Sequence, residues 1–299
     1  MTSPSGRSLF LSHDGYEAEL VEVGAGLRAL RHDGYDVVAG YARDEMCSAG
    51  RGQLLIPWPN RIRDGRYEFE GVTLQLALTE PAARNAIHGL TRWVNWSLLD
   101  HSAASAIWGL ELNPQPGYPF SLDLTIDYTL GDQGLRAEVS ATNVGQTAAP
   151  YGSGAHPYLT VGRPIDECEL TLPATIRAET DERGIPGDPA PVAGGPFDFS
   201  SPRFVGDTTF DHPFGGLVAD EHSVARVFLL DPDSGRSAAL WVDASYRWLQ
   251  VYSGDKLGGR AREALAVEPM TCPPDAFNTG VDLIALQPGD THTASFGLA

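Results

Sequence analysis

Apolar and polar residues alternate along much of this chain, most regularly on the two sides of one short turn. Apolar residues occupy every second position in residues 122–130 and again in residues 135–142, and Gly131 to Gly134 separates the two runs. A period of two places successive side chains on opposite faces of a strand. The pattern therefore predicts an antiparallel hairpin with one face on the core and one face in water.

The same alternation recurs from one end of the chain to the other. It covers residues 18–23, 67–76 and 224–230, and it resumes at 238–242 after the turn sequence Asp-Pro-Asp-Ser-Gly. No window of twelve or more residues carries a helical stripe of apolar positions with caps. The predicted fold class is therefore all-β, with one antiparallel β-sandwich domain spanning residues 1–299.

Glycine and proline mark the expected connections. The stretches 184–191 and 194–196 are rich in both residue types and predict long loops. Each is short and is followed by further strand-like pattern, which does not resemble a linker between independent domains.

Composition and charge narrow the classes of partner. The chain has 299 residues, of which 42% are hydrophobic and 20% charged, as in folded proteins. Its net charge of −18 would repel nucleic-acid phosphates and anionic lipid surfaces. We therefore expect neither nucleic acid nor a membrane as a partner.

The cysteines and the N-terminal residues predict a cytoplasmic protein. Cys47, Cys168 and Cys272 are an odd number without paired spacing, so neither a disulfide framework nor a thiolate zinc site is indicated. The first thirty residues carry several acidic side chains among the apolar ones, and no apolar run of about 18 residues occurs.

A first candidate for ligand binding is the segment of residues 56–62. It places Trp58, Asn60 and Arg61 around two prolines that restrict the backbone. An aromatic face can stack on a sugar ring, and Arg or Asn can hydrogen-bond its hydroxyls. Taken alone, the segment is more typical of a proline-rich turn with a surface arginine.

Three further residues supply proton-transfer chemistry. His88 precedes Gly89, His156 precedes Pro157, and Glu268 follows an apolar stretch before Pro269. Each residue alone is typical of a structural role. Together, two imidazoles and a carboxylate can remove one proton from a substrate and add another, and burial of Glu268 would raise its pKa toward neutrality.

Other chemistries have weaker support. His88, His156 and Glu268 also have the composition of a two-histidine, one-carboxylate metal site, but the close spacings common in such sites are absent, so we predict no metal. No dinucleotide fingerprint, P-loop or serine nucleophile motif occurs, and no cofactor is predicted. Asp211 and Glu268 keep glycoside hydrolysis open as an alternative.

Six segments in a fixed order carry a family resemblance. They are Pro59-Asn60-Arg61-Ile62, Gly65-Arg-Tyr67 with Gly71, Asn85-Ala-Ile-His88-Gly89, His156-Pro157-Tyr158, Phe210-Asp211-His212-Pro-Phe214, and Glu268-Pro-Met-Thr-Cys-Pro-Pro-Asp-Ala-Phe277-Asn278. With these segments nearly the whole chain resembles the aldose 1-epimerase (galactose mutarotase) family. The resemblance implies a large antiparallel β-sandwich, also called a supersandwich.

The resemblance also implies roles for individual residues. Glu268 matches the general base that takes the proton from the C1 hydroxyl, and His156 matches the general acid that protonates the ring oxygen. His88 matches a second histidine that hydrogen-bonds the sugar. Arg61 and Asp211 match sugar-binding positions, with Asp207 as a competing carboxylate for the latter.

The expected activity is then cofactor-independent interconversion of the α and β anomers of a hexose. Two alternatives stay open: a carbohydrate-binding or sensing protein without catalysis, and an epimerase of hexose 6-phosphates. The phosphate of the second alternative would call for a basic cluster, of which Arg61 and Arg63 are the visible members. The expected partner is a small sugar, and the sequence gives no oligomeric state.

Overall fold

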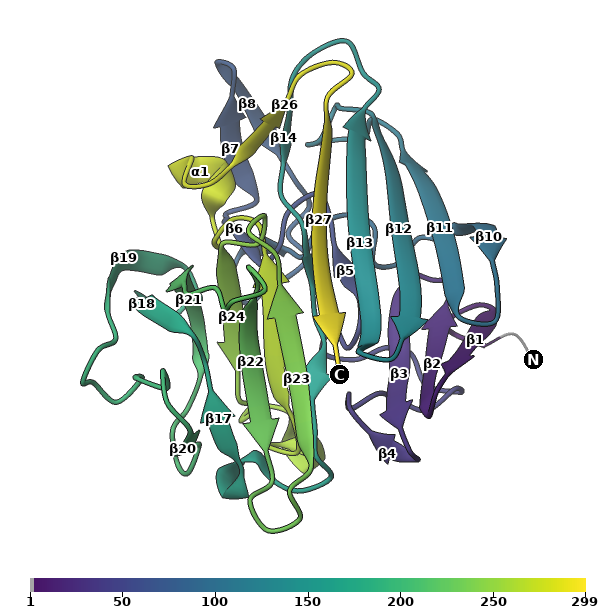
Figure 1. The fold of residues 1–299 in the computed structure, drawn as a ribbon. Coiled ribbons are helices and arrows are strands. Elements are labelled where there is room, and N and C mark those ends of the chain that lie inside the picture. The colour runs from purple at the N-terminus through teal and green to yellow at the C-terminus, as the bar shows by residue number, and fades with distance from the viewer. Residues whose placement is uncertain (1–2) are drawn as a thin grey trace.

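The computed structural model describes residues 3–299, and these residues form two large antiparallel sheets with little helix (Figure 1). One hydrophobic cluster contains residues of both sheets, among them Ile126 and Val139 of the first and Leu249 and Val267 of the second. The prediction of an all-β sandwich is confirmed. The single-domain interpretation stays a prediction.

The larger sheet has nine strands. In spatial order they are β10 (Ser97–His101), β11 (Ser105–Leu112), β12 (Leu122–Gly131), β13 (Gly134–Asn143), β27 (Thr291–Leu298), β23 (Ser237–Val242), β22 (Ala225–Leu230), β17 (Glu169–Thr171) and β20 (Arg203–Phe204).

The second sheet has eight strands. In order they are β19 (Pro186–Pro191), β18 (Ala174–Thr180), β21 (Asp211–Leu217), β24 (Trp248–Tyr252), β25 (Leu265–Met270), β15 (Gly154–Ala155) and β5 (Leu54–Leu55), and β16 (Tyr158–Leu159) also pairs with β25.

The remaining secondary structure consists of smaller elements. A four-stranded sheet contains β1 (Ser8–His13), β2 (Tyr16–Val21), β3 (Gly26–His32) and β4 (Tyr35–Asp36). Three strand pairs are β6 (Arg61–Arg63) with β9 (Asn85–Ile87), β7 (Arg66–Phe69) with β8 (Val72–Gln75), and β14 (Ala149–Tyr151) with β26 (Ile284–Leu286). The helical elements are α1 (Ala276–Thr279) and the single 3₁₀ turns η1 (Ile165–Glu167) and η2 (Gly258–Arg260). Among residues 3–299, no helix has the length and hydropathy needed to span a membrane.

The predicted hairpin forms as expected. Strands β12 and β13 pair from Leu122 opposite Asn143 to Gly131 opposite Gly134, so the connection has two residues. The apolar residues of both strands are buried, and the alternating polar ones are partly or fully exposed. Alternation therefore located both the strands and their buried face.

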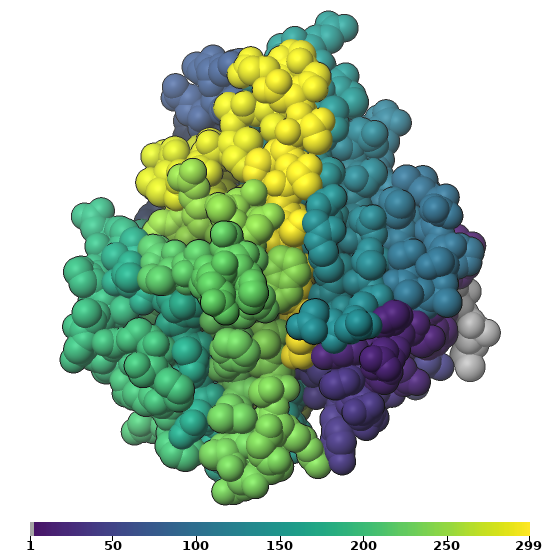
Figure 2. Space-filling view, viewed as in Figure 1, coloured from purple at the N-terminus to yellow at the C-terminus, as the bar shows by residue number. Residues whose placement is uncertain are grey.

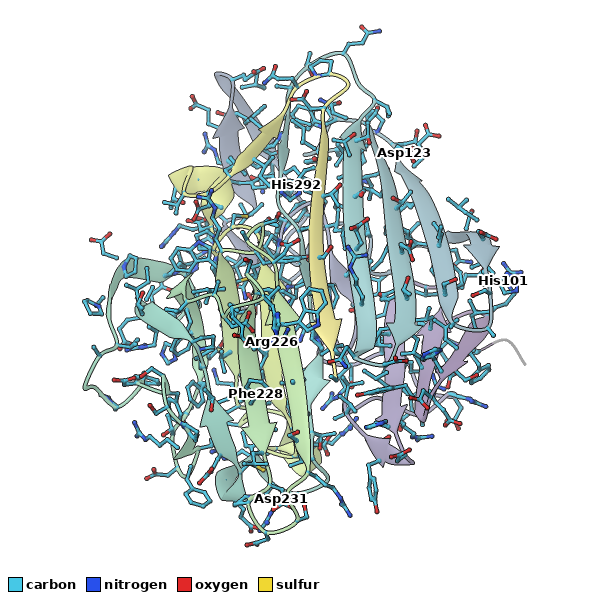
Figure 3. All side chains as sticks on the ribbon, viewed as in Figure 1. His101, Asp123, Arg226, Phe228, Asp231 and His292 are labelled. Carbon is cyan, nitrogen blue, oxygen red and sulfur yellow. The ribbon has the colours of Figure 1, made fainter. Side chains whose placement is uncertain are left out.

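The C-terminal strand lies in the middle of the larger sheet. Strand β27 pairs with β13 on one side and with β23 on the other. In Figure 2 its yellow atoms run between the teal and green parts of the chain. The solvent-facing side of this sheet is mixed in character, since Arg226 and Phe228 both project outward from β22 (Figure 3).

Residues 67–76 form strands, as the alternation predicted, and they make the hairpin β7–β8 because Glu70 and Gly71 both have positive φ and form a two-residue turn. One expectation about local structure was wrong. The stretch 184–191, expected to be loop, contains β19. Its prolines are accommodated because β19 is an edge strand, where missing N–H donors cost little.

Candidate active site

The floor of the site is the face of the eight-stranded sheet that points away from the core. On β25, Leu265 and Val267 belong to the hydrophobic core, so the alternation turns Glu268 to the opposite face. Gln250 on β24 lies directly across from Glu268 and donates from Nε2 to Asp211 Oδ1 of β21 at 3.0 Å. Three neighbouring strands thus present three polar side chains on one face.

His156 is held beside Glu268 by the chain that crosses the end of this sheet. It lies between β15 and β16, both of which pair with β25. Its backbone N–H donates to the Gln53 carbonyl at 3.0 Å, and its own carbonyl accepts from the Gly52 N–H at 2.9 Å. The imidazole Nε2 lies 3.4 Å from Glu268 Oε1.

His88 enters the site from a strained turn after β9. Its φ is +62°, and its Nδ1 accepts a hydrogen bond from the Asn60 backbone N–H at 3.2 Å. The neutral ring therefore carries its proton on Nε2. Gly89 follows because a Cβ there would lie 2.0 Å from the Ile56 carbonyl oxygen. The rings of His88 and His156 meet edge to face with centroids 5.3 Å apart.

These residues share one cavity of about 460 Å³, a size within the usual range for ligand sites of about 300–1,000 Å³. Its wall includes the five residues to which the family resemblance assigns roles: Arg61, His88, His156, Asp211 and Glu268. The remaining lining is Cys47, Ala49, Gly50, Asn60, Thr79, Glu80, Ile87, Arg92, Trp93, Tyr158, Tyr252, Lys256 and Leu257. Segments far apart in the sequence thus meet around a single space.

Arg61 is fixed by an ion pair within the cavity wall. Its Nε donates to Glu80 Oε2 at 2.9 Å and its Nη2 to Glu80 Oε1 at 3.0 Å. Asn85 Nδ2 also donates to Glu80 at 2.9 Å. The two parallel bonds hold the plane of the guanidinium. Within the described part of the chain, its Nη1 hydrogen-bonds only Asn60 Oδ1, at 3.4 Å.

Burial opposes charge on both central groups. Glu268 is 2% exposed, and burial raises its pKa well above the ordinary carboxyl value; the nearby Asp211 charge raises the pKa further, whereas Arg61 opposes the shift. Burial lowers the pKa of His156 to about 3, with a further contribution from Arg92. At 3.4 Å the pair is coupled, so between its two pKa values it holds one proton.

The same two groups lack other polar partners. Neither Glu268 Oε2 nor His156 Nδ1 has a hydrogen-bond partner among residues 3–299. Buried polar atoms are nearly always paired, and exceptions concentrate where a ligand or a chemical step uses them. Two adjacent unpaired groups beside a cavity therefore mark this position as the candidate reaction centre.

Two details of the sequence interpretation, the positions of Trp58 and Arg63, were wrong. Trp58 is buried in the core, 2% exposed, and packs against Phe277, so it cannot stack on a ligand. Trp93, which is 50% exposed, supplies an aromatic side chain of the cavity wall instead. Arg63 lies outside the cavity and faces Asp181, so it forms no basic cluster with Arg61.

Of the two competing carboxylates, Asp211 lines the cavity, whereas Asp207 lies exposed in a turn. Sequence reasoning missed Arg92, Lys256, Glu80 and Trp93, which lie in segments without a regular pattern. No local signal marks them, because only the folding of the loops over the sheet places them on this wall.

His88, His156 and Glu268 also form the one group with the composition of a metal site that occurs among the described residues. Their candidate ligand atoms are up to 4.8 Å apart. Tetrahedral bonds of about 2.1 Å place ligand atoms about 3.4 Å apart, so the side chains would have to move together to enclose an ion.

Comparison with known proteins places the chain among sugar epimerases. Residues 7–299 match the family described as aldose 1-epimerase. The chain is 38% identical over 296 residues to the uncharacterized protein YihR of Escherichia coli, which covers 98% of this chain and 93% of the relative. It is 29% identical over 267 residues to the maltose epimerase of Levilactobacillus brevis, over 79% of this chain and 76% of that enzyme.

The fold is also that of solved structures. A Caenorhabditis elegans protein described as a GalM/aldose epimerase homologue superposes with a TM-score of 0.85 at 23% identity, over 98% of this chain and 99% of that one. The architecture is therefore of the galactose mutarotase type, as the sequence motifs predicted.

Proposed function

The chain belongs to the aldose 1-epimerase family, and from that premise we propose that it is an enzyme that interconverts the α and β anomers of an aldohexose. Opening the ring of a cyclic hemiacetal requires removal of the proton on O1 and protonation of the ring oxygen O5. The observation that carries the proposal is the pair His156 and Glu268, which lie 3.4 Å apart, buried, beside one cavity.

In the proposed reaction, Glu268 is the base and His156 the acid. The Glu268 carboxylate takes the proton from O1, the C1–O5 bond breaks as O1 becomes the aldehyde oxygen, and the His156 imidazolium gives its proton to O5. The pair changes from carboxylate and imidazolium to carboxylic acid and imidazole. After rotation about C1–C2, the same steps in reverse close the ring on the other face.

In the resting pair the single proton lies on Glu268, because burial raises the pKa of this carboxyl and lowers the pKa of His156. The carboxylate and imidazolium that react form when this proton moves to His156 across the 3.4 Å between the two groups. From that state, burial favours the proposed direction of proton transfer. A carboxylate whose pKa is raised is a stronger base, and an imidazolium whose pKa is lowered is a stronger acid. Each positioned group can contribute about 10² to 10⁴-fold in rate. The surrounding protein thus makes both charged forms more reactive than the free side chains in water.

The other cavity residues bind and orient the sugar in this proposal. His88 donates from Nε2, because its Nδ1 already accepts from Asn60. Arg61 donates to ring hydroxyls from the edge that Glu80 leaves free, and Asp211 accepts from them. No step uses a metal or an organic cofactor, because occupancy by a metal would engage the lone pairs that must receive and release protons.

A second candidate differs in the substrate. Arg92 and Lys256 line the cavity, and neither forms an ion pair with a carboxylate among residues 3–299; Arg92 donates only to the Gln53 side chain and the Ile87 carbonyl. Unpaired cations favour a sugar that carries an anionic group, as in a hexose 6-phosphate. Arg92 and Lys256 therefore support the alternative of a hexose 6-phosphate epimerase, which Arg63 does not support.

Proton NMR of freshly dissolved sugars tests the proposal directly. We expect the enzyme to accelerate exchange between anomers of at least one sugar in a panel of glucose, galactose, maltose and hexose 6-phosphates. Sugar binding by calorimetry without exchange would instead support a sensing protein. Release of reducing sugar from an aryl glycoside would support a hydrolase that uses Asp211 and Glu268. The cytoplasmic location stays a prediction.

A further inference from the structure

A buried guanidinium lies behind the reaction centre. Arg51 is 3% exposed and belongs to the loop of residues 47–53, which also supplies the backbone partners of His156. Among residues 3–299 its one carboxylate partner is Glu263 at 3.4 Å, and its Nη1 reaches Ser48 at 3.4 Å or more. A buried cation with a single distant counter-charge is costly, which suggests a use for its charge.

Arg51 contacts His156 through one aromatic ring. Its Cζ lies 4.7 Å from the centre of the Tyr158 ring. The Tyr158 ring also stacks on the His156 imidazole, with 5.0 Å between centroids and 11° between planes. The Tyr158 hydroxyl donates to the Ala49 carbonyl at 3.0 Å, which fixes the ring between the two partners.

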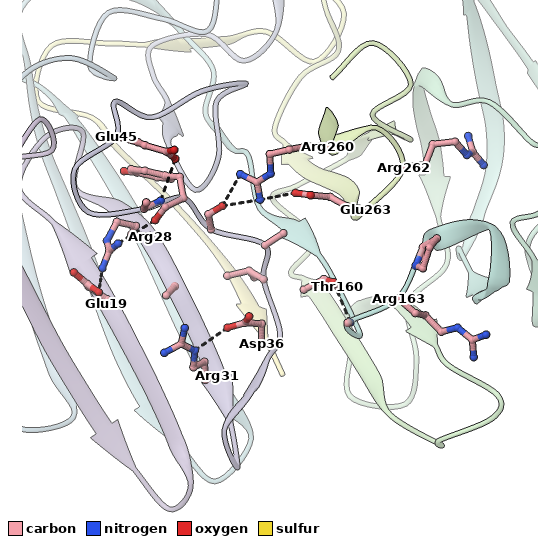
Figure 4. Close-up of a pocket in the computed structure, with 18 of the residues that line it drawn as sticks. Glu19, Arg28, Arg31, Asp36, Glu45, Thr160, Arg163, Arg260, Arg262 and Glu263 are labelled. Carbon is pink, nitrogen blue, oxygen red and sulfur yellow. Dashed lines mark hydrogen bonds and ion pairs between the residues drawn. The ribbon is translucent and has the colours of Figure 1, made fainter. Parts of the chain in front are cut away.

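The counter-charge of Arg51 is shared. Glu263 also pairs with Arg260, whose guanidinium donates to the Gly40 carbonyl (Figure 4). This pair lies on the wall of a separate cavity of about 970 Å³, and Glu263 is partly exposed there. Because Glu263 pairs with both Arg51 and Arg260, it neutralises the charge of Arg51 only in part.

We propose that Arg51 is a positioning residue for His156: through the Tyr158 ring it holds the imidazole against Glu268, an inference that rests on the proposed function. Arg51 does not line the catalytic cavity, so its effect passes through the Tyr158 ring and through its charge. Stacking fixes the plane of the imidazole, and the cation disfavours a second positive charge nearby.

Several charged or titratable groups face His156 from the surrounding elements. They are Glu268 on β25, His88 and Arg92 after β9, Arg61 on β6, Tyr158 on β16 and Arg51 in the loop before β5. Burial is the main cause of the lowered pKa of His156, followed by Arg92, and Arg51 lowers it further. Of these groups, Arg51 is the one that contacts the stacked Tyr158 ring as a cation.

The distance from Arg51 to His156 sets the size of the expected change in the pKa of His156. The Arg51 Cζ lies within about 10 Å of the His156 ring, given the two successive contacts of 4.7 and 5.0 Å. At an effective dielectric constant of about 20, a unit charge at that distance shifts a pKa by about one unit. The partial counter-charge of Glu263 reduces this to roughly half a unit.

Two substitutions of opposite sign test the proposal. In Arg51→Met, loss of the cation should move the profile of kcat/KM against pH to higher pH by about half a unit or more. In Glu263→Gln, the unopposed Arg51 charge should move it to lower pH. Arg51→Lys should restore the wild-type profile, because it keeps the charge. Because Glu263 is partly exposed, we expect Glu263→Gln to fold, so it tests the proposal even if Arg51→Met does not fold.

Arg28→Met is the matched control. Arg28 is also a buried guanidinium paired with one glutamate, Glu19, but it lies on the wall of the 970 Å³ cavity and not behind His156 (Figure 4). We expect it to lower stability and leave the pH profile unchanged. Equal profiles for Arg51→Met, Glu263→Gln and the wild type, or equal shifts in Arg28→Met, would overturn the proposal.

A second readout separates this inference from the proposed function. The ring ¹⁵N resonances of His156, identified by their loss in His156→Asn, report its titration without turnover. An upward shift of the midpoint in Arg51→Met supports the inference even if the wild type exchanges no anomers. An unchanged midpoint overturns it even if the wild type is active.

Discussion

Substitution of Gly50 by alanine should displace the proposed acid without removing or adding any polar group. Gly50 has a φ of +71° in the loop beside His156. A Cβ at this position would lie 2.5 Å from His156 Cδ2 and 3.1 Å from Nε2. Carbon atoms in contact sit about 3.5 Å apart, so the ring must move by about 1 Å.

That displacement sets the expected loss of activity. A misplacement of about 1 Å in a catalytic group costs about 10²-fold in rate, which corresponds to about 2.7 kcal/mol in the activation free energy. The left-handed backbone adds a strain of about 1–2 kcal/mol to any residue with a Cβ, which lowers stability and not the rate. The two effects are therefore separable.

Gly162→Ala provides the matched control. Gly162 has a similar φ of +81°, and a Cβ there would meet no heavy atom within 4 Å. Urea unfolding should show a comparable loss of stability in both alanine variants, and anomer exchange by NMR should fall about 10²-fold only in Gly50→Ala. Wild-type exchange rates in Gly50→Ala would show that the position of His156 does not govern catalysis.

Three further outcomes follow from the same geometry. Glu80→Gln should raise KM about 10-fold with little change in kcat, because Arg61 loses the charged partner that orients it for binding; a loss confined to kcat would contradict that role. The folded protein keeps a proton on Glu268 that the unfolded chain loses above about pH 4.3, because burial raises the pKa of this carboxyl. As the pH rises from that value to the raised pKa, the wild type should therefore lose stability relative to Glu268→Gln by about 1.4 kcal/mol per pH unit. Parallel curves of unfolding free energy against pH for the two proteins would refute the burial argument. Exhaustive EDTA treatment should leave anomer exchange unchanged, and a loss that zinc or manganese restores would assign His88, His156 and Glu268 to a metal.

The strands were predictable where one face of the sheet is wet. The alternation in residues 122–142 determines which side chains of β12 and β13 are buried, because a shift of one residue would reverse the two faces. The strand at 186–191 was not predictable, since its three prolines are typical of a loop and only its place at the sheet edge makes them compatible with pairing.

The sequence likewise indicated some residues of the candidate site and not others. Glu268 and His156 were found because an acidic residue in an apolar strand and a histidine before proline stand out locally, and the family motifs added the pairing. Arg51 and Arg92 were not found, because their importance depends on neighbours from other segments. Trp58 was misplaced, since a tryptophan near prolines has the same local pattern in a core as at a surface.

The most direct test of the proposed chemistry is the rate of anomer exchange by Glu268→Gln on the best sugar of the panel. The amide preserves the size of the side chain but cannot accept the O1 proton. We predict a loss of at least about 10²-fold in kcat with sugar affinity, measured by calorimetry, nearly unchanged. A folded Glu268→Gln protein that exchanges anomers at the wild-type rate would contradict the account.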